Sequence, residues 1–249
     1  MCGSLSVFAS EFDAANQKFK AGDFYGAANA YEEILTREGP RAAVFYNLGN
    51  SYSQFGKYAP AILAYERARL ITPRDSDLLA NLASAQKAAS IEEDKFNDPW
   101  FNDILHYLSR NEWAWLVTGA SLFLGCLSLI FGAMKLSRIS QLWGLISASV
   151  AGVIIVVAAG ALTMRHNESN RGVVLSEDAQ VRLSPFEKAE SVGQLKPGQS
   201  VTLGSRNGNF YYVESAGRSL EGWISKEDVA LISLSFAPFQ QDEHHVGEK

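Results

Sequence analysis

Hydrophobic and polar positions along the chain divide it into three zones. Residues 113–134 and 139–164 contain no charged side chain and are rich in Leu, Val, Ala and Ile, whereas the sequence on either side is polar. A helix over 113–134 is about 33 Å long, enough to cross the roughly 30 Å hydrocarbon core of a bilayer. The pattern predicts two transmembrane helices, at 113–134 and 142–164, that form a helical hairpin. A pair of buried core helices is the alternative, which the small size of the chain disfavours.

Aromatic and small residues within these runs fit a membrane hairpin. Trp113, Trp115 and Trp143 lie at the ends of the runs, where indole rings prefer the headgroup layer. Small residues let two membrane helices approach closely, so we expect the glycines inside the runs at the contact between the helices. These glycines are Gly119, Gly125, Gly132, Gly144, Gly152 and Gly160.

The loop at 135–141 sets the expected orientation of the hairpin. It carries Lys135 and Arg138 and no acid, and short loops rich in Lys and Arg stay in the cytoplasm. We therefore expect a cytoplasmic loop, with the polar segments before and after the hairpin both outside the cytoplasm. Arg165 and Arg171, which follow the second run, argue for the opposite orientation.

The first nine residues resemble the end of an export signal. Val7-Phe8-Ala9 has the small-residue spacing of a signal-peptidase site, although the segment has no basic start and only a short apolar stretch. We expect residues 1–9 to be the remnant of a signal peptide that starts further upstream. A lipid anchor on Cys2 is the alternative.

The segment at 10–90 repeats itself at an interval of 34 residues. Gly22-Asp23-Phe24 recurs as Gly56-Lys57-Tyr58, Ala27 recurs as Ala61 and Tyr31 as Tyr65. One full unit covers 42–75, and its characteristic positions are Phe45, Leu48, Gly49, Tyr52, Ala61, Tyr65, Ala68 and Pro73. This pattern resembles the tetratricopeptide repeat, in which small residues stand where paired helices touch and aromatic residues fill the space between them.

A weaker unit covers 8–41, and a closing helix is expected at 76–90, capped by Asp75 or Ser76. The resemblance implies an all-α solenoid, and an unrelated amphipathic bundle is the alternative. Solenoids usually need three or more units for stability, so we expect the membrane segment or a partner to supply further contacts.

The first helix of each repeat unit is expected to line a concave, partner-binding face. The residues expected there are Phe12, Asn16, Phe19, Lys20, Ala43, Tyr46, Asn50, Gln54, Asp77, Ser84 and Lys87. Asn16 and Asn47 stand where chaperone-binding members of the family hold a C-terminal carboxylate. The cationic positions of that clamp are occupied here by Phe12, Asp77 and Asn81, so we do not expect carboxylate binding. Asn47 also has a purely structural interpretation, as a hydrogen-bond partner of nearby backbone.

Residues 91–112 link the repeats to the first membrane run. Asp98-Pro99 is a good helix start, and the apolar residues that follow recur at helical spacing. An interfacial helix and a linker packed against the repeats are both compatible with this pattern.

Beyond 172 the pattern changes to short β-type runs separated by turn residues. Strands are expected at 173–175, 179–183, 200–203, 211–214, 222–224 and 229–232. The motifs Val181-Arg182-Leu183-Ser184, 192–201, 209–213 and Gly222-Trp223-Ile224 resemble those of bacterial SH3-like domains. The resemblance implies a small all-β barrel over 172–233, in which Phe210, Tyr212 and Trp223 line a peptide or glycan groove. A core position is the alternative for all three aromatic residues and is the favoured one for Trp223. Residues 234–249, with His244-His245, are expected to be a disordered tail.

Composition excludes several functional classes. A net charge of −5, with only 22 Lys and Arg, gives no basic surface for nucleic acid. Two cysteines, Cys2 and Cys126, exclude a disulfide framework or a Cys-rich zinc site, and four histidines leave little for a histidine-based metal site. The G-x-S-x-G and GxxxxGK[ST] motifs are absent. We therefore expect no cofactor, no metal, no catalytic residues and no enzymatic activity.

The order of the modules, repeats then paired spans then SH3-like barrel, resembles that of the BatE-type proteins of bacterial aerotolerance operons. This resemblance implies an inner-membrane protein with periplasmic soluble domains. It also implies protein partners, namely membrane proteins with von Willebrand factor A domains and a MoxR-type AAA+ ATPase. The expected function is a membrane-anchored scaffold that binds proteins through its repeats. The alternatives are an envelope sensor or anchor whose barrel binds peptidoglycan or a peptide, and a purely structural hairpin.

Overall fold

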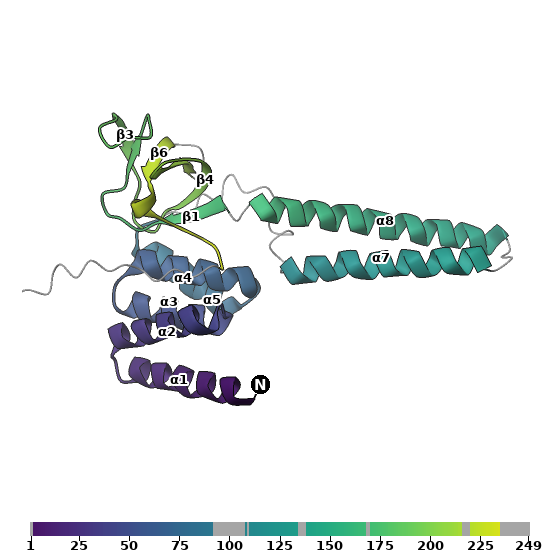
Figure 1. Ribbon diagram of the computed structural model, residues 1–249, viewed down its shortest axis with the longest axis horizontal. Coiled ribbons are helices and arrows are strands. Elements are labelled where there is room, and N and C mark those ends of the chain that lie inside the picture. Colours follow the sequence, from purple (N-terminus) through teal and green to yellow (C-terminus); the bar gives the residue numbers. More distant parts are fainter. Residues whose placement is uncertain are drawn as a thin grey trace, which may run out of the picture.

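A computed structural model describes residues 2–91, 108, 110–133, 138–167, 170–215 and 220–234. Within them the chain forms seven α-helices and one antiparallel sheet of seven strands, so it mixes helix and sheet. Figure 1 shows three parts: a stack of helices α1–α5, a curled sheet above α4, and a long helical hairpin, α7 and α8, that projects to one side.

The helical stack is built from pairs. The helices are α1 (Cys2–Lys20), α2 (Phe24–Glu38), α3 (Ala42–Gln54), α4 (Tyr58–Ile71) and α5 (Ser76–Ala88). The turns inside the two pairs are alike, because Gly22 and Gly56, which occupy equivalent positions of the repeat, have φ of 82° and 79°. That left-handed conformation is easily adopted only by glycine. The expected closing helix is confirmed, and Asp75 caps it by accepting from the backbone N–H groups of Asp77 and Leu78.

Small residues stand where these helices touch, as expected. Ala61 and Ala68 on α4 have no exposed surface, and Tyr65 of the same helix, 1% exposed, packs against Gly49 of α3. A Cβ added at Gly49 would lie 2.5 Å from the ring of Tyr65, so the aromatic residue needs a glycine opposite it. Residues 2–9, expected to be the remnant of a signal peptide, continue α1 without a break.

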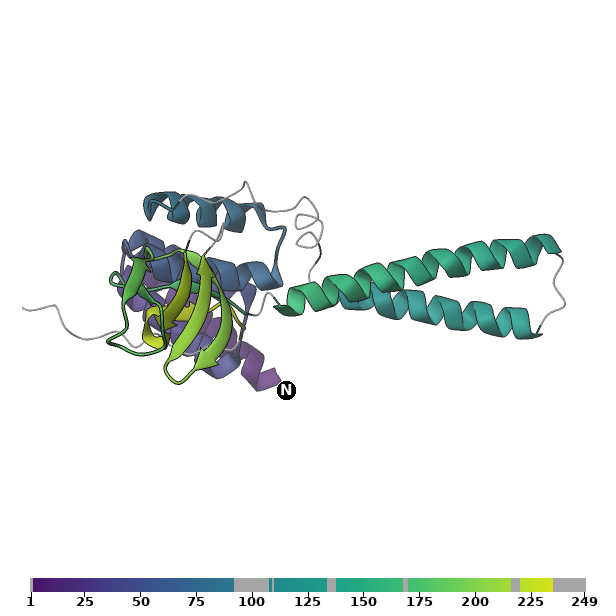
Figure 2. The same cartoon turned by 90° about the horizontal axis from the view of Figure 1, so that it is seen from above.

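The hairpin consists of α7 (Arg110–Ala133) and α8 (Arg138–Asn167), which lie side by side in all views (Figures 1 and 2). Among the described residues, one segment, Trp143–Thr163, is long and apolar enough to cross a membrane, with a mean hydropathy of 2.5. The span expected at 113–134 stays a prediction. Residues 138–141, expected in the loop, instead form the first turn of α8.

Three alanines of α8 are buried in the hairpin, and Gly144 of the same helix is buried as well. Ala151, Ala158 and Ala161 are at most 4% exposed, and Trp113 packs against the last two. Added Cβ atoms at Gly119, Gly125, Gly152 and Gly160 would meet nothing within 4 Å. These four glycines therefore make no close contact with the other helix, contrary to expectation, and Gly119 lines the hollow along the hairpin. Trp113, 6% exposed, is likewise buried between the helices and not at a free surface, unlike Trp115 and Trp143.

The seven strands pair in the order β3-β2-β6-β5-β4-β1-β7, each pair antiparallel. They are β1 (Arg171–Val174), β2 (Gln180–Arg182), β3 (Ser191–Gln194), β4 (Ser200–Asn207), β5 (Phe210–Ser215), β6 (Glu221–Ser225) and β7 (Val229–Leu231). The sheet curls around its own apolar core, which includes Val181, Val213 and Ile224. β3 was not among the six strands expected from the hydrophobic runs, because Ser191–Gln194 contains one apolar side chain in four.

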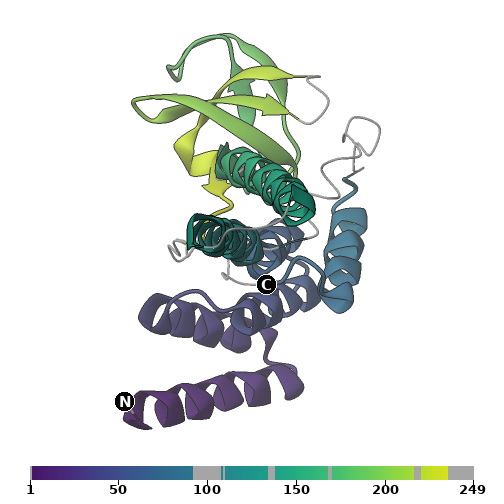
Figure 3. The same ribbon diagram turned by 90° about the vertical axis from the view of Figure 1, so that its right-hand side faces the viewer.

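The curled sheet rests on the helical stack (Figures 1 and 3). Val173 of β1 and Ile232, next to β7, belong to the apolar core of the helices and are at most 3% exposed. Arg67 of α4 donates from Nη2 to the carbonyl oxygen of Leu231 at 3.2 Å. The sheet therefore adds apolar contacts and a hydrogen bond to the helical stack. The sequence pattern did not indicate this docking.

Most of the linker at 91–112 and of the tail at 234–249 lies outside the described residues. The expected interfacial helix, the expected disorder of the tail and His244-His245 therefore fall outside the described residues. Arg74, after α4, pairs with Glu112 in the first turn of α7, so the base of the hairpin contacts the helical stack.

Candidate functional site

A cavity of about 300 Å³ opens on the helical stack and is the candidate site. Its lining comes from α1, α3, α4 and α5, the elements of three successive units. The lining residues are Phe19, Asn50, Ser53, Gln54, Tyr65, Asn81 and Ser84. We call this cavity the amide groove, because three of the seven side chains are carboxamides and none carries a charge at neutral pH.

The groove is built on a hydrogen-bond pattern that repeats with the sequence. In the first unit, the Tyr31 hydroxyl donates to Asn16 Oδ1 at 2.6 Å, and Asn47 Nδ2 donates to the same oxygen at 3.1 Å. In the second unit, the Tyr65 hydroxyl donates to Asn50 Oδ1 at 2.8 Å, and Asn81 Nδ2 donates to it at 2.9 Å. Each residue of the second set lies one repeat period after its counterpart. The repeat therefore reproduces a polar contact as well as a core.

Aromatic rings accompany this pattern at the same spacing. The rings of Phe12 and Tyr31 have centroids 5.9 Å apart at 56°, and those of Tyr46 and Tyr65 are 6.1 Å apart at 52°. The Tyr46 hydroxyl also accepts from Asn81 Nδ2 at 3.0 Å, a bond that Phe12 has no hydroxyl to accept in the first unit. The second unit is therefore the more tightly connected of the two.

Burial keeps the two tyrosine hydroxyls in their neutral form. It raises the pKa of Tyr31 to about 12, partly offset by a hydrogen bond from Asn47. It raises the pKa of Tyr65 further, with Tyr46 acting in the same direction. Both hydroxyls consequently remain donors across the physiological range, and the oxygens of Asn16 and Asn50 remain acceptors.

The structure brings together part of the expected concave face. Phe19, Asn50, Gln54 and Ser84 line the amide groove. Phe12, Asn16 and Tyr46 take part in the repeated contacts beside it but do not line it. The other expected residues, Lys20, Ala43, Asp77 and Lys87, are exposed and are not among the lining residues.

Sequence reasoning missed three lining residues: Ser53, Tyr65 and Asn81. Tyr65 was assigned to the core, and it is indeed buried, but its hydroxyl reaches the groove. Asn81 follows Asn47 by one repeat period, and that spacing was the signal that could have found it.

Asn47 has neither of the roles considered from the sequence. Its side chain hydrogen-bonds the carboxamide of Asn16 and not nearby backbone. Since both asparagines are engaged with each other, they are not arranged around a ligand carboxylate.

The aromatic residues of the sheet are divided between two environments. Tyr212 and Trp223 face each other across β5 and β6 on the outer side of the sheet, half-buried, with ring centroids 5.5 Å apart at 76°. Trp223 is therefore not a core residue. Phe210, only 8% exposed, lies on β5 and is less accessible to a ligand than the other two.

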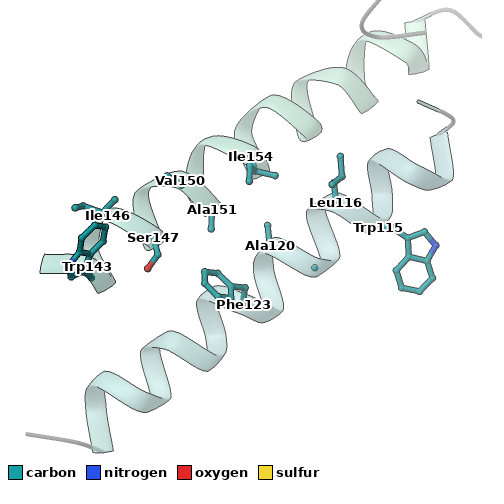
Figure 4. A pocket seen from close by; sticks show the side chains of 11 residues that line it. Trp115, Leu116, Ala120, Phe123, Trp143, Ile146, Ser147, Val150, Ala151 and Ile154 are labelled. Atoms are coloured by element: carbon teal, nitrogen blue, oxygen red, sulfur yellow. The ribbon is translucent and has the colours of Figure 1, made fainter. Parts of the chain in front are cut away.

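A second, larger hollow of about 600 Å³ runs along the hairpin (Figure 4). Trp115 and Trp143 lie at its two ends, and Ala120, Ser147 and Ala151 lie between α7 and α8. Its lining contains no ionisable side chain. Trp115 is 74% exposed and Trp143 68%. We therefore place the candidate site in the amide groove.

Within the described part of the chain, no three His, Cys, Asp or Glu side chains come together as a metal site. A scan against protein-family models finds no match to the chain. A search of curated proteins also finds no match.

Proposed function

We propose that this protein is a non-enzymatic, membrane-anchored adaptor that binds a polypeptide partner in the amide groove. In this proposal the helices α1–α5 are a tetratricopeptide-repeat solenoid, the sheet is an SH3-like barrel, and α7 and α8 both cross the membrane. The groove carries the proposal, because it is a polar cavity that the repeat itself builds.

The constant interval between equivalent residues supports the tetratricopeptide assignment. Paired helices, a glycine turn and an aromatic ring over a small residue all recur at that spacing. The seven strands form one antiparallel sheet that curls around a single apolar core. This arrangement is compatible with an SH3-like barrel.

The hairpin supports anchoring in a membrane. Trp143–Thr163 has the length and apolarity of a span, and α7 accompanies it over its whole length. By its resemblance to BatE-type proteins, we propose a bacterial inner-membrane location with periplasmic soluble parts. The partners proposed on the same basis are membrane proteins with von Willebrand factor A domains and a MoxR-type AAA+ ATPase.

Co-purification of partners with variants of the groove tests the proposal. Tyr46→Ala combined with Asn50→Ala removes one ring and one carboxamide, and we expect it to abolish co-purification of the protein partners. The control is Tyr25→Ala combined with Phe55→Ala, an exposed aromatic pair outside the groove lining, which should retain them. Unchanged co-purification with the groove variant, at normal helix content by circular dichroism, would reject the groove as the binding site.

A second candidate function rests on Tyr212 and Trp223. Their half-exposed rings suit stacking on a sugar or a peptide, so the outer side of the sheet is a candidate reader of peptidoglycan. The test mixes purified cell wall with the full chain in nanodiscs, and separately with the Trp223→Ala variant, and measures how much of each protein sediments with the wall. Equal sedimentation of the two proteins, or none, would reject this function.

A further inference from the structure

We propose that Arg67 is a positioning residue that fixes one seating of the sheet, meaning one position and orientation, on the helical stack. It thereby holds together the two parts of the protein that the hairpin separates in the sequence. The inference goes beyond the proposed adaptor function and does not depend on what the amide groove binds. It rests on a buried guanidinium that donates to a main-chain carbonyl across the contact between the two parts.

Arg67 closes an edge of the sheet. Among the described strands, β7 is the last in the pairing order and has β1 alone beside it. The N–H of Ile232 donates to the carbonyl oxygen of Arg171 on β1, so the alternation of an antiparallel ladder turns the carbonyl of Leu231 away from β1 and towards α4. A carbonyl covered by a helix is costly to leave without a donor, and Arg67 Nη2 supplies one at 3.2 Å.

An arginine at this place is expensive compared with an apolar side chain. Arg67 is only 4% exposed, and burial lowers its pKa to about 10, partly offset by the attraction of Glu32. The guanidinium therefore stays charged at neutral pH in a site that disfavours charge. Buried charges of this kind add little net stability over apolar side chains, and their best-attested use is to specify one arrangement among several.

The helical stack orients the guanidinium from its own side. Glu32 of α2, which attracts Arg67, accepts from the hydroxyl of Tyr52 on α3 at 2.5 Å. Residues of three successive helices therefore set the position of the donor that meets β7. The donors of a guanidinium lie in a rigid planar fork, so the bond that it makes has a defined direction.

The apolar part of the contact does not define a direction. Val173 and Ile232 join the core of the helices, but apolar burial depends on area alone, so a sheet shifted along α4 would still bury apolar surface. The hydrogen bond from Arg67 does not survive such a shift. One residue away from Leu231 along β7, the carbonyl of Ala230 points the other way, into the pairing with β1.

The seating of the sheet also affects the base of the hairpin. β1 begins at Arg171, close behind the end of α8 at Asn167, and the base of α7 joins the helical stack through the pair of Glu112 with Arg74. The two helices of the hairpin therefore leave from parts that Arg67 holds together (Figures 1 and 3). A sheet that shifted on α4 would move the base of α8 relative to that of α7.

Distances between two spin labels measure the seating. The labels are attached to Glu33→Cys on α2 and Thr202→Cys on β4, both at exposed positions. The native cysteines are removed by Cys2→Ser and Cys126→Ser. Double electron–electron resonance is recorded on the full chain in detergent, and we expect one narrow distribution of distances for this parent protein.

The decisive variant combines Arg67→Met with Glu32→Gln. It replaces both charges with uncharged groups of similar size and keeps an acceptor for the Tyr52 hydroxyl, so we expect normal helix content by circular dichroism. Because the directional donor is gone, the distance distribution should become about twofold wider or more, or gain a second maximum. Lys196→Met is the matched control: it removes an exposed donor that contacts the carbonyl of Ser90 across the same interface at 3.5 Å, and it should keep the parent distribution.

Two single variants complete the test. Arg67→Gln, with Glu32 unchanged, replaces the double variant if that one loses helix content, and it should also widen the distribution because its side chain is shorter than that of arginine. Arg67→Lys keeps a donor and the charge and should return the distribution towards the parent width. An unchanged distribution in a folded Arg67→Met or Arg67→Gln protein would overturn the inference, and so would equal widening in Lys196→Met. These measurements contain no groove ligand, so the proposed function is tested separately.

Discussion

Docking of the sheet on the helical stack can be tested at a single glycine. Gly198, in the turn before β4, has φ of 89°, and a Cβ added there would lie 2.7 Å from Ile91 Cδ1 and 2.8 Å from Ile62 Cδ1. Ile62 is fully buried in the helical core. Gly198→Ala therefore introduces a methyl group into the contact between the two parts of the protein.

The magnitude follows from two terms. An alanine at positive φ costs about 1–2 kcal/mol wherever it stands. The two methyl contacts are closer by roughly 1 Å than the ordinary 3.5–4.0 Å between carbon atoms, and overpacking of this kind costs about 1–3 kcal/mol. Gly56→Ala is the matched control, because its φ of 79° gives the same backbone strain and its Cβ would meet nothing within 4 Å.

Thermal unfolding of the full chain in detergent measures the difference. Since about 1 kcal/mol shifts Tm by about 2–4 °C in a chain of this size, Gly198→Ala should lower Tm by roughly 2–12 °C more than Gly56→Ala. Hydrogen exchange of α4 should also quicken in Gly198→Ala alone, because the sheet must move off it to make room. Equal losses in the two variants, with α4 equally protected, would show that the sheet does not pack on α4 as described.

Three further outcomes are expected. Tyr65→Phe and Tyr31→Phe should each lower the free energy of unfolding by about 1 kcal/mol, because each leaves a carboxamide oxygen without its hydroxyl donor. Urea titrations measure this loss, and wild-type stability in both variants would contradict the repeated hydrogen bond. Burial raises the pKa of Glu32 above 4.5, so the folded state binds its proton more tightly, and the stabilisation present at low pH is lost as pH rises through the raised pKa. Unfolding measured at about pH 4 and at neutral pH should therefore show a larger fall in stability for the wild type than for Glu32→Gln, and identical falls would refute the shift. Ala158→Leu should destabilise the hairpin because the alanine has no exposed surface, whereas Gly160→Leu, which faces outward, should not; similar Tm values for the two would contradict the observed contact.

The helical part could be predicted well because its structure follows from local pattern. A constant repeat interval, a glycine in the turn of each helix pair and an acidic cap at Asp75 indicated the helix pairs and the start of α5, although α1 begins earlier than expected, at Cys2. The hairpin could be foreseen as two helices for the same reason, since apolar length alone identifies it. Which faces meet was not foreseeable from composition: Gly119, Gly125, Gly152 and Gly160 make no close contact, whereas the alanines at 151, 158 and 161 are buried.

The candidate site was predicted only in part because a groove depends on how several helices meet. Helical spacing identified Asn50 and Gln54, but it gave no reason to connect Asn81 with Tyr65, which lie on different helices. β3 was not among the strands predicted from hydrophobic runs because only one of its four side chains is apolar, and its pairing with β2 is what makes it a strand.

The amino-acid sequence by itself determined the helix pairs, the apolar hairpin and the positions of most strands, because each of these depends on residues close together in the chain. Tertiary structure alone decided that Val173 and Ile232 join the apolar core of helices α1–α5, which lie far earlier in the chain. It also decided that Asn16 and Asn50 each direct their side-chain oxygen to a tyrosine hydroxyl. Both are contacts between distant segments, and their free energy arises only when those segments exclude water from each other.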